Sequence, residues 1–356
     1  MHTYIIAEAG VNHNGRLNLA LQLCDAAKAA GVDCVKFQTW QTEKIVTRKA
    51  EKATYQSENT HDVKENQFDM LKKLELSYED FRIVQEHCRK IGIDFLSTPD
   101  EEHSLAFLMN ELHLPIIKIG SGEVTNIPYL RQMASYGKPI ILSTGMATLV
   151  QVAIAYDTLL AAGASSVALL HCTTNYPCPK NEVNLRAMQT MREAFKCQVG
   201  YSDHTMGTEI PIAAVALGAE IIEKHFTLDR NMEGPDHKAS LEPQELKYMV
   251  DCIRNIEVAL GDGIKRPNPS EVEISKVVLK SIVAKVYLPK YILVMVRMFV
   301  NGFKMLISFG IVIIMMVIYR VPVSFNILYM IPIMLTLFLF TFGCSTIVAH
   351  FGVFVQ

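Results

Sequence analysis

Residues 139–171 read PIILSTGMATLVQVAIAYDTLLAAGASSVALLH. Two short apolar runs, Pro139–Ser143 and Val167–His171, flank a longer amphipathic stretch, Leu149–Ala162. Short runs that are apolar throughout are typical of strands whose two faces are both covered by other structure. The stretch therefore predicts a strand, a helix and a second strand parallel to the first, which is the repeating unit of α/β folds.

The same alternation recurs through the first 262 residues. Further short runs lie at Tyr4–Ala9, Cys34–Gln38, Asp94–Ser97, Ile116–Ile119, Gln198–Ser202 and Ala219–His225, and helical patterns between them include Leu17–Ala30, Tyr78–Ile91 and Gln244–Leu260. These repeats predict a (β/α)8 TIM barrel over residues 1–262, and a doubly wound parallel sheet is the alternative. The long segment Glu43–Leu76 is expected to cover a ligand at the barrel mouth.

Composition excludes several classes of protein. The chain has 356 residues, with 34 Lys and Arg against 36 Asp and Glu, so its formal net charge is −2. A nucleic-acid-binding protein needs concentrated positive charge, so we expect no nucleic-acid partner. The 8 cysteines form no C-x-x-C pair, which indicates buried thiols in a reducing cytosol. With no signal peptide at the N-terminus, we expect a cytoplasmic barrel.

Two histidines stand at the ends of neighbouring predicted strands. His204 follows the seventh run and His225 ends the eighth. In this fold the active site collects at the carboxyl ends of the strands, and adjacent strands lie about 5 Å apart. The two imidazoles can therefore point at one ion, and two His with further oxygen ligands suit Mn²⁺, Mg²⁺, Fe²⁺ or Zn²⁺. The alternative is that each His is a hydrogen-bonded structural residue.

Two lysines end strands that otherwise read as buried. Lys36 and Lys118 are unusual at such positions, because an ammonium group is rarely buried without a partner. One interpretation is a salt bridge to Glu8 or Glu123. The other is a receptor for the phosphate and carboxylate of a small anionic ligand, which would satisfy both lysines at once.

Carboxylates also lie near the predicted mouth. Glu223 and His225 share one face of their strand, because side chains alternate with a period of two. A carboxylate beside a bound metal can orient a hydroxyl or move a proton, and Glu8 and Glu223 are candidates for that work. Asp236, in Gly-Pro-Asp-His, is either a ligand contact or an ordinary turn residue.

Nine strings together carry a family resemblance. They are Ala7–Gly15, Val35–Thr39, Ser97–Pro99, Lys118–Glu123, Leu142–Met146, His171–Pro177, Ser202–Thr205, Glu223–Thr227 and Gly234–Ser240. In this order, over residues 3–285, they resemble the N-acetylneuraminate (sialic acid) synthases. Legionaminate and pseudaminate synthases share most of the same strings.

The resemblance implies a reaction. Such enzymes condense phosphoenolpyruvate with an N-acetylated hexosamine, in the first place N-acetylmannosamine, to give N-acetylneuraminate and phosphate. A diacetamido-trideoxyhexose, as in legionaminate or pseudaminate synthases, is the alternative. A divalent metal, Mn²⁺ before Mg²⁺ or Co²⁺, polarises the open-chain aldehyde so that the enol carbon can attack. Water captures the resulting oxocarbenium, and the intermediate loses phosphate through C–O cleavage.

The resemblance also implies roles for individual positions. Glu8, Lys118 and Glu223 match catalytic residues, and Glu8 handles protons near the attacking water. The expected phosphoenolpyruvate contacts are Lys36, Thr98, Lys118, Ser121, Ser143, Thr174 and Ser202. The expected sugar contacts are Gln38, Asn59, Tyr176, Glu223 and Asp236, and the expected metal ligands are His204 and His225.

The likeness fades after residue 285. Family members continue into an antifreeze-like domain that, in the homodimer, supplies an arginine to the partner's sugar site. Here residues 263–285 read as a linker and the start of that domain, and 286–356 form a hydrophobic tail without Asp or Glu. Its apolar runs, Phe303–Tyr319 and Val321–Gly343, are near the ~20 residues of a membrane helix.

Two interpretations of this tail stay open: real membrane helices, or the product of a frameshift or gene fusion. In either case the loss of the domain predicts weaker sugar binding and puts the homodimer in doubt. An inactive truncated barrel tethered to a membrane is a further alternative.

Overall fold

The structure, a computed structural model, describes residues 2–52, 65–279, 290–322 and 324–351. The chain divides into two compact units, residues 1–263 and residues 264–356, and each is described by itself. The expected sugar contact Asn59 and the expected change of character at residue 286 lie outside the described residues.

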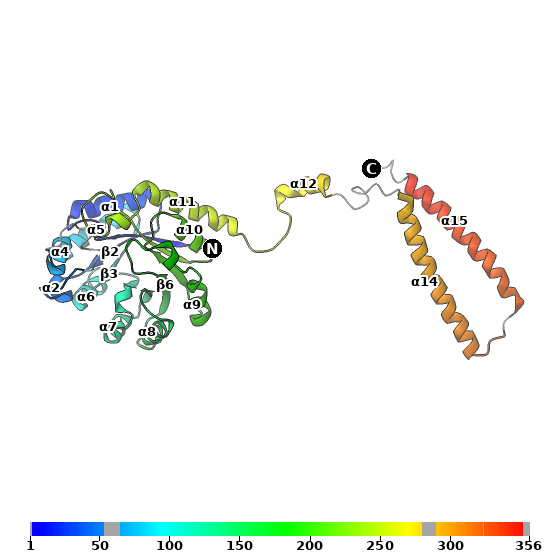
Figure 1. The fold of residues 1–356 in the computed structure, drawn as a ribbon, viewed down its shortest axis with the longest axis horizontal. Helices are drawn as coiled ribbons and strands as arrows, with labels where there is room; N and C mark the ends of the chain where they lie inside the picture. Colours follow the sequence, from blue (N-terminus) through cyan, green and yellow to red (C-terminus); the bar gives the residue numbers. More distant parts are fainter. Residues whose placement is uncertain (1, 53–64, 280–289, 323, 352–356) are drawn as a thin grey trace. The chain divides into compact units, whose positions relative to one another are not determined.

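A sheet of 8 parallel strands forms the centre of the first unit (Figure 1). The strands are β1 Tyr4–Gly10, β2 Cys34–Thr39, β3 Asp94–Pro99, β4 Ile117–Ile119, β5 Pro139–Ser143, β6 Ser166–Cys172, β7 Val199–Asp203 and β8 Ile221–His225. They pair in the order β3-β2-β1-β8-β7-β6-β5-β4. Because β3 and β4 also lie in contact, the ring is nearly closed. This confirms the predicted barrel and rules out the doubly wound sheet.

Helices alternate with these strands. They are α1 Leu17–Ala30, α2 Thr42–Ile45, α4 Gln67–Leu74, α5 Tyr78–Ile91, α6 Glu102–Asn110, α7 Ile127–Ala134, α8 Leu149–Ala161, α9 Ala187–Phe195, α10 Glu209–Ala216 and α11 Pro243–Leu260, with short 3-10 helices at Ser121–Glu123, Lys180–Glu182 and His237–Ala239. Local sequence sets their ends. Ser77 and Asp80 form a capping box that starts α5, and Gly92, with a φ of 72°, ends it. The predicted bounds of α1, α5, α8 and α11 agree with the structure to within one residue.

The inside of the barrel changes from apolar to polar along the strands. An apolar cluster fills the lower part, and its buried members are Ile6, Cys34, Leu96, Ile141, Ala168, Leu170 and Ile221. Two residues further along these strands come Glu8, Lys36, Thr98, Ser143, Cys172 and Glu223. Because side chains alternate with a period of two, both sets lie on the inner face. The polar set therefore lies at the carboxyl ends of the strands.

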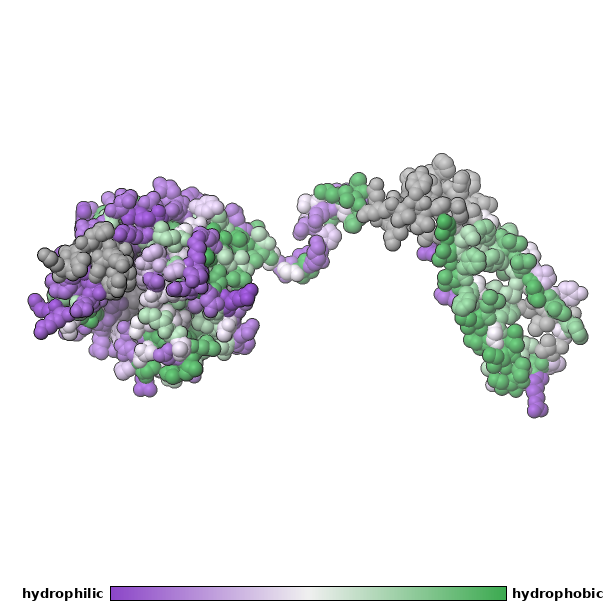
Figure 2. All heavy atoms as spheres, in the orientation of Figure 1, coloured by the Kyte–Doolittle hydropathy of each residue, from purple (hydrophilic) through white to green (hydrophobic). Residues whose placement is uncertain are grey.

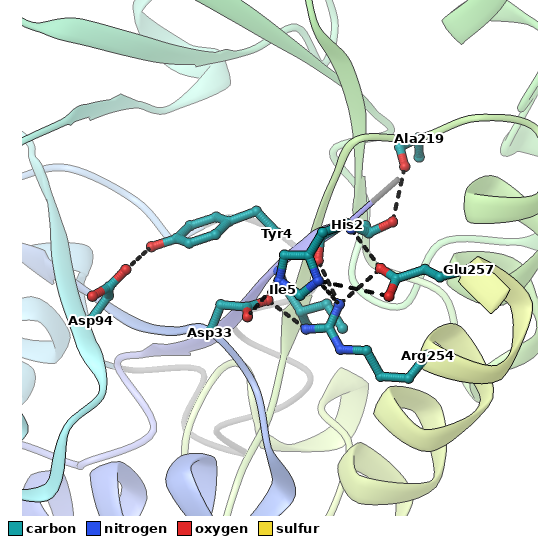
Figure 3. A network of polar contacts seen from close by, with 9 residues as sticks. His2, Tyr4, Ile5, Asp33, Asp94, Ala219, Arg254 and Glu257 are labelled. Carbon is teal, nitrogen blue, oxygen red and sulfur yellow. Dashed lines mark hydrogen bonds and ion pairs between the residues drawn. The ribbon is translucent and has the colours of Figure 1, made fainter.

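The opposite end of the barrel is tied together by charged groups (Figure 3). Arg254 on α11 donates to Asp33 at 2.7 Å and to the Thr3 carbonyl at 2.8 Å, and it pairs with Glu257 at 2.8 Å. Tyr4 donates to Asp94 at 2.7 Å. These contacts fasten the first strand to the last helix of the barrel at the end opposite the polar set.

The second unit contains α12 Pro269–Val278, α14 Lys290–Ile318, a 3-10 helix at Phe325–Tyr329 and α15 Met330–Phe351. The surfaces of α14 and α15 are mostly apolar (Figure 2). Among the described residues, Val294–Ile318 is, by length and composition, able to cross a membrane.

The second predicted apolar run, Val321–Gly343, does not form one continuous helix, so a single membrane helix over that range is a wrong prediction. The chain takes a left-handed turn at Arg320, where φ is 49°, and proline at 322 cannot continue a helix. The helix in this region, α15, begins only at Met330, and the apolar stretch among its described residues is Ile331–Cys344.

Candidate active site

Four charged side chains converge at the carboxyl ends of the strands. Glu8 on β1, Lys36 on β2, Lys118 on β4 and Glu223 on β8 are 1%, 3%, 2% and 5% exposed, and we call them the tetrad. Lys36 Nζ lies 2.6 Å from Glu8 Oε2 and 3.9 Å from Glu223 Oε2, and Lys118 Nζ lies 3.3 Å from the same Glu223 oxygen. Both lysines thus face one carboxylate, and their ammonium groups lie close enough together to reach one small anionic ligand.

The ion-pair interpretation is therefore correct for Lys36 with Glu8, whereas Lys118 pairs with Glu223 and, among the described contacts, neither lysine pairs with Glu123. Glu123 instead accepts a hydrogen bond from Asn126 at 2.7 Å, three residues along the chain. The 3-10 turn Ser121–Glu123 that follows β4 places this carboxylate beside Asn126, the residue that caps α7.

The charges in the tetrad set distinct proton affinities. Burial raises the pKa of Glu8 to about 7, although Lys36 acts against it. Burial also acts to raise the pKa of Glu223, but Lys118 and Lys36 outweigh it and lower that pKa to about 2. At neutral pH Glu223 is therefore an anion, whereas Glu8 can gain or lose a proton.

Three of the predicted hydroxyl groups border the tetrad. Lys36 Nζ donates to Thr98 Oγ1 at 3.0 Å, and Lys118 Nζ donates to Ser143 Oγ at 2.8 Å. Ser202 donates to Glu223 Oε1 at 2.8 Å. These side chains come from β3, β5 and β7, so the polar rim extends around the barrel. Hydroxyl groups at these positions can turn from the tetrad to a phosphate or carboxylate oxygen.

Ser121 and Thr174 meet at a second point of the rim, beside Gly145. The amide of Gly145 donates to Ser121 Oγ at 2.9 Å. A Cβ at position 145 would lie 2.2 Å from Thr174 Oγ1 and 2.9 Å from Ser121 Oγ, so any other residue would displace these hydroxyl groups. Thr174 Oγ1 is buried and has no hydrogen-bond partner among the described residues. A buried hydroxyl of this kind is ready to receive a ligand.

The two predicted metal ligands lie side by side. The rings of His204 and His225 have centroids 5.4 Å apart, and Tyr176 packs 4.2 Å from the first and 5.4 Å from the second. His225 Nδ1 lies 3.9 Å from Asp236 Oδ2. The loops after β6, β7 and β8 thus bring Tyr176, His204 and Asp236 next to the end of β8.

The His204 and His225 rings are in the protonation state that a metal ligand needs. His204 Nδ1 contacts the Thr173 carbonyl at 2.7 Å. A carbonyl only accepts, so Nδ1 carries the proton and Nε2 keeps a free lone pair. His225 Nδ1 is buried without a hydrogen bond in the described chain. Burial lowers the pKa of both rings, so both are neutral at pH 7. Two neutral imidazoles fit a divalent cation.

No group of three or more His, Cys, Asp or Glu arranged to hold a metal is found in the described ranges. A cation at His204 and His225 would therefore take its other ligands from oxygen atoms of water or substrate.

The remaining sugar candidates differ in placement. Gln38 Nε2 donates to Glu8 Oε1 at 3.4 Å, so it adjoins the tetrad. Asp236 is held by its backbone, because its carbonyl accepts from Ser240 Oγ at 2.7 Å and Asn12 donates to that same Ser240 oxygen at 2.9 Å. Burial raises the pKa of Asp236 to about 6.

Sequence reasoning missed several supporting residues. Asn12 and Ser240 hold Asp236, and Gly145 makes room for Thr174. Asp203 and Lys224 form an ion pair next to both histidines. All five belong to the quoted strings or flank them, but only the folded loops show which groups they contact.

Comparisons with known proteins agree with the site. The model of the NeuB family matches residues 23–265. The N,N'-diacetyllegionaminic acid synthase of Campylobacter jejuni is 54% identical over 80% of this chain and 85% of that protein. The synthase of the same name from Legionella pneumophila is 48% identical over 79% of this chain and 80% of that protein.

More distant relatives include named sialic acid enzymes. Human N-acetylneuraminate-9-phosphate synthase is 38% identical over 81% of this chain and 79% of that protein. The solved sialic acid synthetase of Leptospira borgpetersenii superposes with a TM-score of 0.68 at 35% identity, over 79% of this chain and 94% of that chain. The chain therefore belongs to the NeuB family, as its motifs predict, and is a synthase of the type that joins phosphoenolpyruvate to an amino sugar.

Proposed function

We propose that this chain condenses phosphoenolpyruvate with a diacetamido-trideoxyhexose to form N,N'-diacetyllegionaminic acid and phosphate. The observation that carries the proposal is the convergence of two buried ammonium groups, Lys36 and Lys118, on one Glu223 oxygen. The two relatives named as N,N'-diacetyllegionaminic acid synthases favour this sugar over N-acetylmannosamine, the first expectation from sequence.

Phosphoenolpyruvate is proposed to bind at the tetrad and its rim. Its phosphate and carboxylate would accept hydrogen bonds from the ammonium groups of Lys36 and Lys118. The hydroxyl groups of Thr98, Ser121, Ser143, Thr174 and Ser202 complete the proposed set of donors. Thr174 Oγ1 supports this assignment, because it is buried and has no partner in the described residues.

A divalent cation, Mn²⁺ before Mg²⁺ or Co²⁺, is proposed to bind His204 and His225. When bound, it would act as a Lewis acid on the aldehyde of the open-chain sugar. The free Nε2 lone pair of His204 and the Nδ1 of His225, which makes no hydrogen bond among the described residues, support this assignment.

The chain's own residues would divide the remaining work. In the condensation a C–C bond forms between the enol carbon and the aldehyde carbon, water adds to the neighbouring carbon, and the C–O bond to phosphate breaks. Glu8, with a pKa of about 7, is proposed to exchange the proton of that water. Glu223 stays anionic and would face the developing positive charge, and Lys118 would hold the leaving phosphate.

The sugar is proposed to lie against Gln38, Tyr176, Glu223 and Asp236. Tyr176 offers an aromatic face beside both histidines, and Asp236 offers a carboxylate fixed by its own backbone contacts. The sequence also proposes Asn59 for this side of the site.

The experiment that tests the function compares two sugars. The full chain is incubated with phosphoenolpyruvate, Mn²⁺ and either the diacetamido-trideoxyhexose or N-acetylmannosamine, and phosphate release is measured with and without EDTA. We expect a kcat/KM at least tenfold higher for the diacetamido sugar, and loss of turnover in EDTA. A preference for N-acetylmannosamine would overturn the sugar, and full activity in EDTA would overturn the metal.

We further propose that α14 tethers a cytoplasmic barrel to a lipid bilayer. Its segment Val294–Ile318 has 25 residues, and none of its apolar window is buried. At 1.5 Å per residue that length exceeds the ~30 Å of hydrocarbon in a bilayer. The tail from residue 286 has no acidic residue, which suits anionic lipid.

Flotation of the full chain with anionic vesicles tests the tether. Ile311 and Ile314 are 57% and 60% exposed on α14, and Ile274 is 59% exposed on α12. We expect Ile311→Asp/Ile314→Asp to abolish flotation, because a charge in a bilayer costs about 3 kcal/mol. The control Ile274→Asp should float like the wild type. Equal flotation of the double variant and the wild type would contradict the tether.

We also propose that the chain forms the homodimer expected for its family, and light scattering in detergent tests this oligomeric state.

A further inference from the structure

A second, fully buried ion pair lies directly behind the two candidate metal ligands. Lys224 Nζ donates to Asp203 Oδ2 at 2.6 Å, and both side chains are 0% exposed. Asp203 precedes His204 on the chain, and Lys224 precedes His225. In the β7–β8 ladder Asp203 and Lys224 are direct partners, so the pair joins the two strands that carry the histidines.

The same ammonium and carboxylate also bind the residue after His204. Lys224 Nζ donates to the carbonyl oxygen of Thr205. Asp203 Oδ1 accepts from the Thr205 amide at 3.1 Å, and Asp203 Oδ2 accepts from the Thr205 hydroxyl at 3.1 Å. The residues on both sides of His204 are therefore fastened to one group on β8.

His204 needs such an attachment more than His225 does. His225 lies within β8 and pairs with Glu8 in the ladder to β1. The last pair of the β7–β8 ladder is Asp203 with Lys224, and His204 lies one residue beyond it. Its own contacts reach the loop after β6, where its carbonyl accepts from the Cys178 amide at 2.8 Å and its ring donates to Thr173.

A purely stabilising role explains this pair poorly. Removing two charges from water costs about as much as their attraction returns, and apolar residues of similar volume often stabilise a core equally well. An apolar pair could not, however, bind the amide, the carbonyl and the hydroxyl of Thr205 at fixed positions. The contacts to Thr205 are what distinguishes this pair from ordinary packing.

We infer that Asp203 and Lys224 are positioning residues that hold the His204 ring at its separation from the His225 ring. The inference rests on the proposed function, because those rings are the proposed ligands of the divalent cation. Groups that orient metal ligands from behind commonly change metal affinity 10- to 100-fold when they are replaced.

The test uses Asp203→Leu/Lys224→Met in the full chain, which leaves no unpaired charge and nearly conserves volume. Thr205→Val is a milder second variant, in case the double variant does not fold, because it removes only the hydroxyl contact to Asp203 and leaves the ion pair intact. Leu159→Ala is the control, because Leu159 is a buried core residue of α8 outside the site. Thermal unfolding of all three is measured, so that losses of stability can be compared with losses of binding.

The first readout is the Mn²⁺ dissociation constant of each chain, from the electron paramagnetic resonance of free Mn²⁺. We expect the double variant to bind 10- to 100-fold more weakly and Thr205→Val at least threefold more weakly. Leu159→Ala should stay within twofold of the wild type, even at a comparable loss of thermal stability. Affinities within twofold of the wild type in both the double variant and Thr205→Val would overturn the inference and leave the pair a stabilising one.

The second readout does not depend on the metal. Crystal structures of the metal-free wild type and variants give the separation of the His204 and His225 ring centroids, which is 5.4 Å here. If the wild type binds no Mn²⁺, the proposed metal site is wrong. The separation of the two rings then decides whether Asp203 and Lys224 are positioning residues. A change of more than about 1 Å in the variants then supports positioning, and an unchanged separation overturns it.

Discussion

Replacing Lys118 with Met removes one of the two ammonium groups proposed to receive phosphoenolpyruvate. Lys118 Nζ donates to Ser143 Oγ at 2.8 Å and lies 3.3 Å from Glu223 Oε2. Methionine keeps most of the volume of the lysine stem, so the packing in the barrel changes little. Glu223 is not left alone, because Ser202 still donates to it at 2.8 Å and Lys36 lies 3.9 Å away.

The expected effect on catalysis follows from the lost hydrogen bond. A hydrogen bond to a charged group contributes about 1.5–3 kcal/mol, which corresponds to about 10- to 150-fold in kcat/KM. The loss should fall on phosphoenolpyruvate. The KM of the sugar should change less than that of phosphoenolpyruvate, because Lys118 touches only Glu223 among the proposed sugar contacts that the structure describes, whereas Tyr176 and Asp236 follow β6 and β8.

The assay measures initial rates of phosphate release at varied phosphoenolpyruvate and saturating sugar. Lys247→Met is the matched control, because Lys247 pairs with Asp251 on the exposed face of α11, where both side chains are more than half exposed. That variant should keep the wild-type kcat/KM within twofold. A fall of less than threefold in the kcat/KM of Lys118→Met for phosphoenolpyruvate would refute the proposed role of Lys118.

Three other perturbations have clear expected outcomes. Glu8→Gln should lower kcat by about 10²- to 10⁴-fold and remove the pH dependence of kcat/KM near pH 7, which stopped-flow or steady-state rates across pH 5–9 can check. Gly145→Ala should destabilise the fold by about 1–3 kcal/mol and raise the KM of phosphoenolpyruvate, because its Cβ would lie 2.2 Å from Thr174 Oγ1; urea unfolding and the same rate assay measure both. Burial raises the pKa of Asp100 from 3.8 to about 7, so its stabilising contribution is present below pH 4 and is lost as the pH rises to 7. Asp100→Asn should therefore raise the free energy of unfolding, relative to the wild type, by about 1 kcal/mol at pH 8 and not at pH 4. A variant that is no more stable than the wild type at pH 8 would contradict this.

The barrel and the location of its site could be predicted from sequence for one physical reason. Strands covered on both faces appear as apolar runs, and parallel strands end at the same rim. Polar residues at the ends of those runs, such as Lys36 and Glu223, therefore had to meet. Their exact partners could not be predicted, because Glu8 and Glu123 were equally available to the lysines before the turn after β4 was known.

Other features depend on loops or on the outer face of the strands. Because side chains alternate along a strand, Lys224 is assigned to the outer face of β8, where an apolar side chain is expected. Its pairing with Asp203 therefore has no signal in the sequence. The contacts that fix Asp236 join Asn12 and Ser240 from opposite ends of the barrel sequence. In the tail, the predicted apolar runs separate at Arg320, where the backbone turns and α14 has ended, but the apolar composition concealed that α15 begins only at Met330.

The fate of one oxygen atom tests the proposed chemistry most directly. The full chain is given Mn²⁺, the diacetamido-trideoxyhexose and phosphoenolpyruvate labelled with ¹⁸O in the bridge between carbon and phosphorus, and the released phosphate is examined by ³¹P NMR. Cleavage of the C–O bond leaves the label in phosphate, and we expect nearly all of the phosphate to carry it. Unlabelled phosphate would mean that the P–O bond breaks instead, and the assignment of Lys36, Lys118 and Glu8 to this condensation would then be wrong.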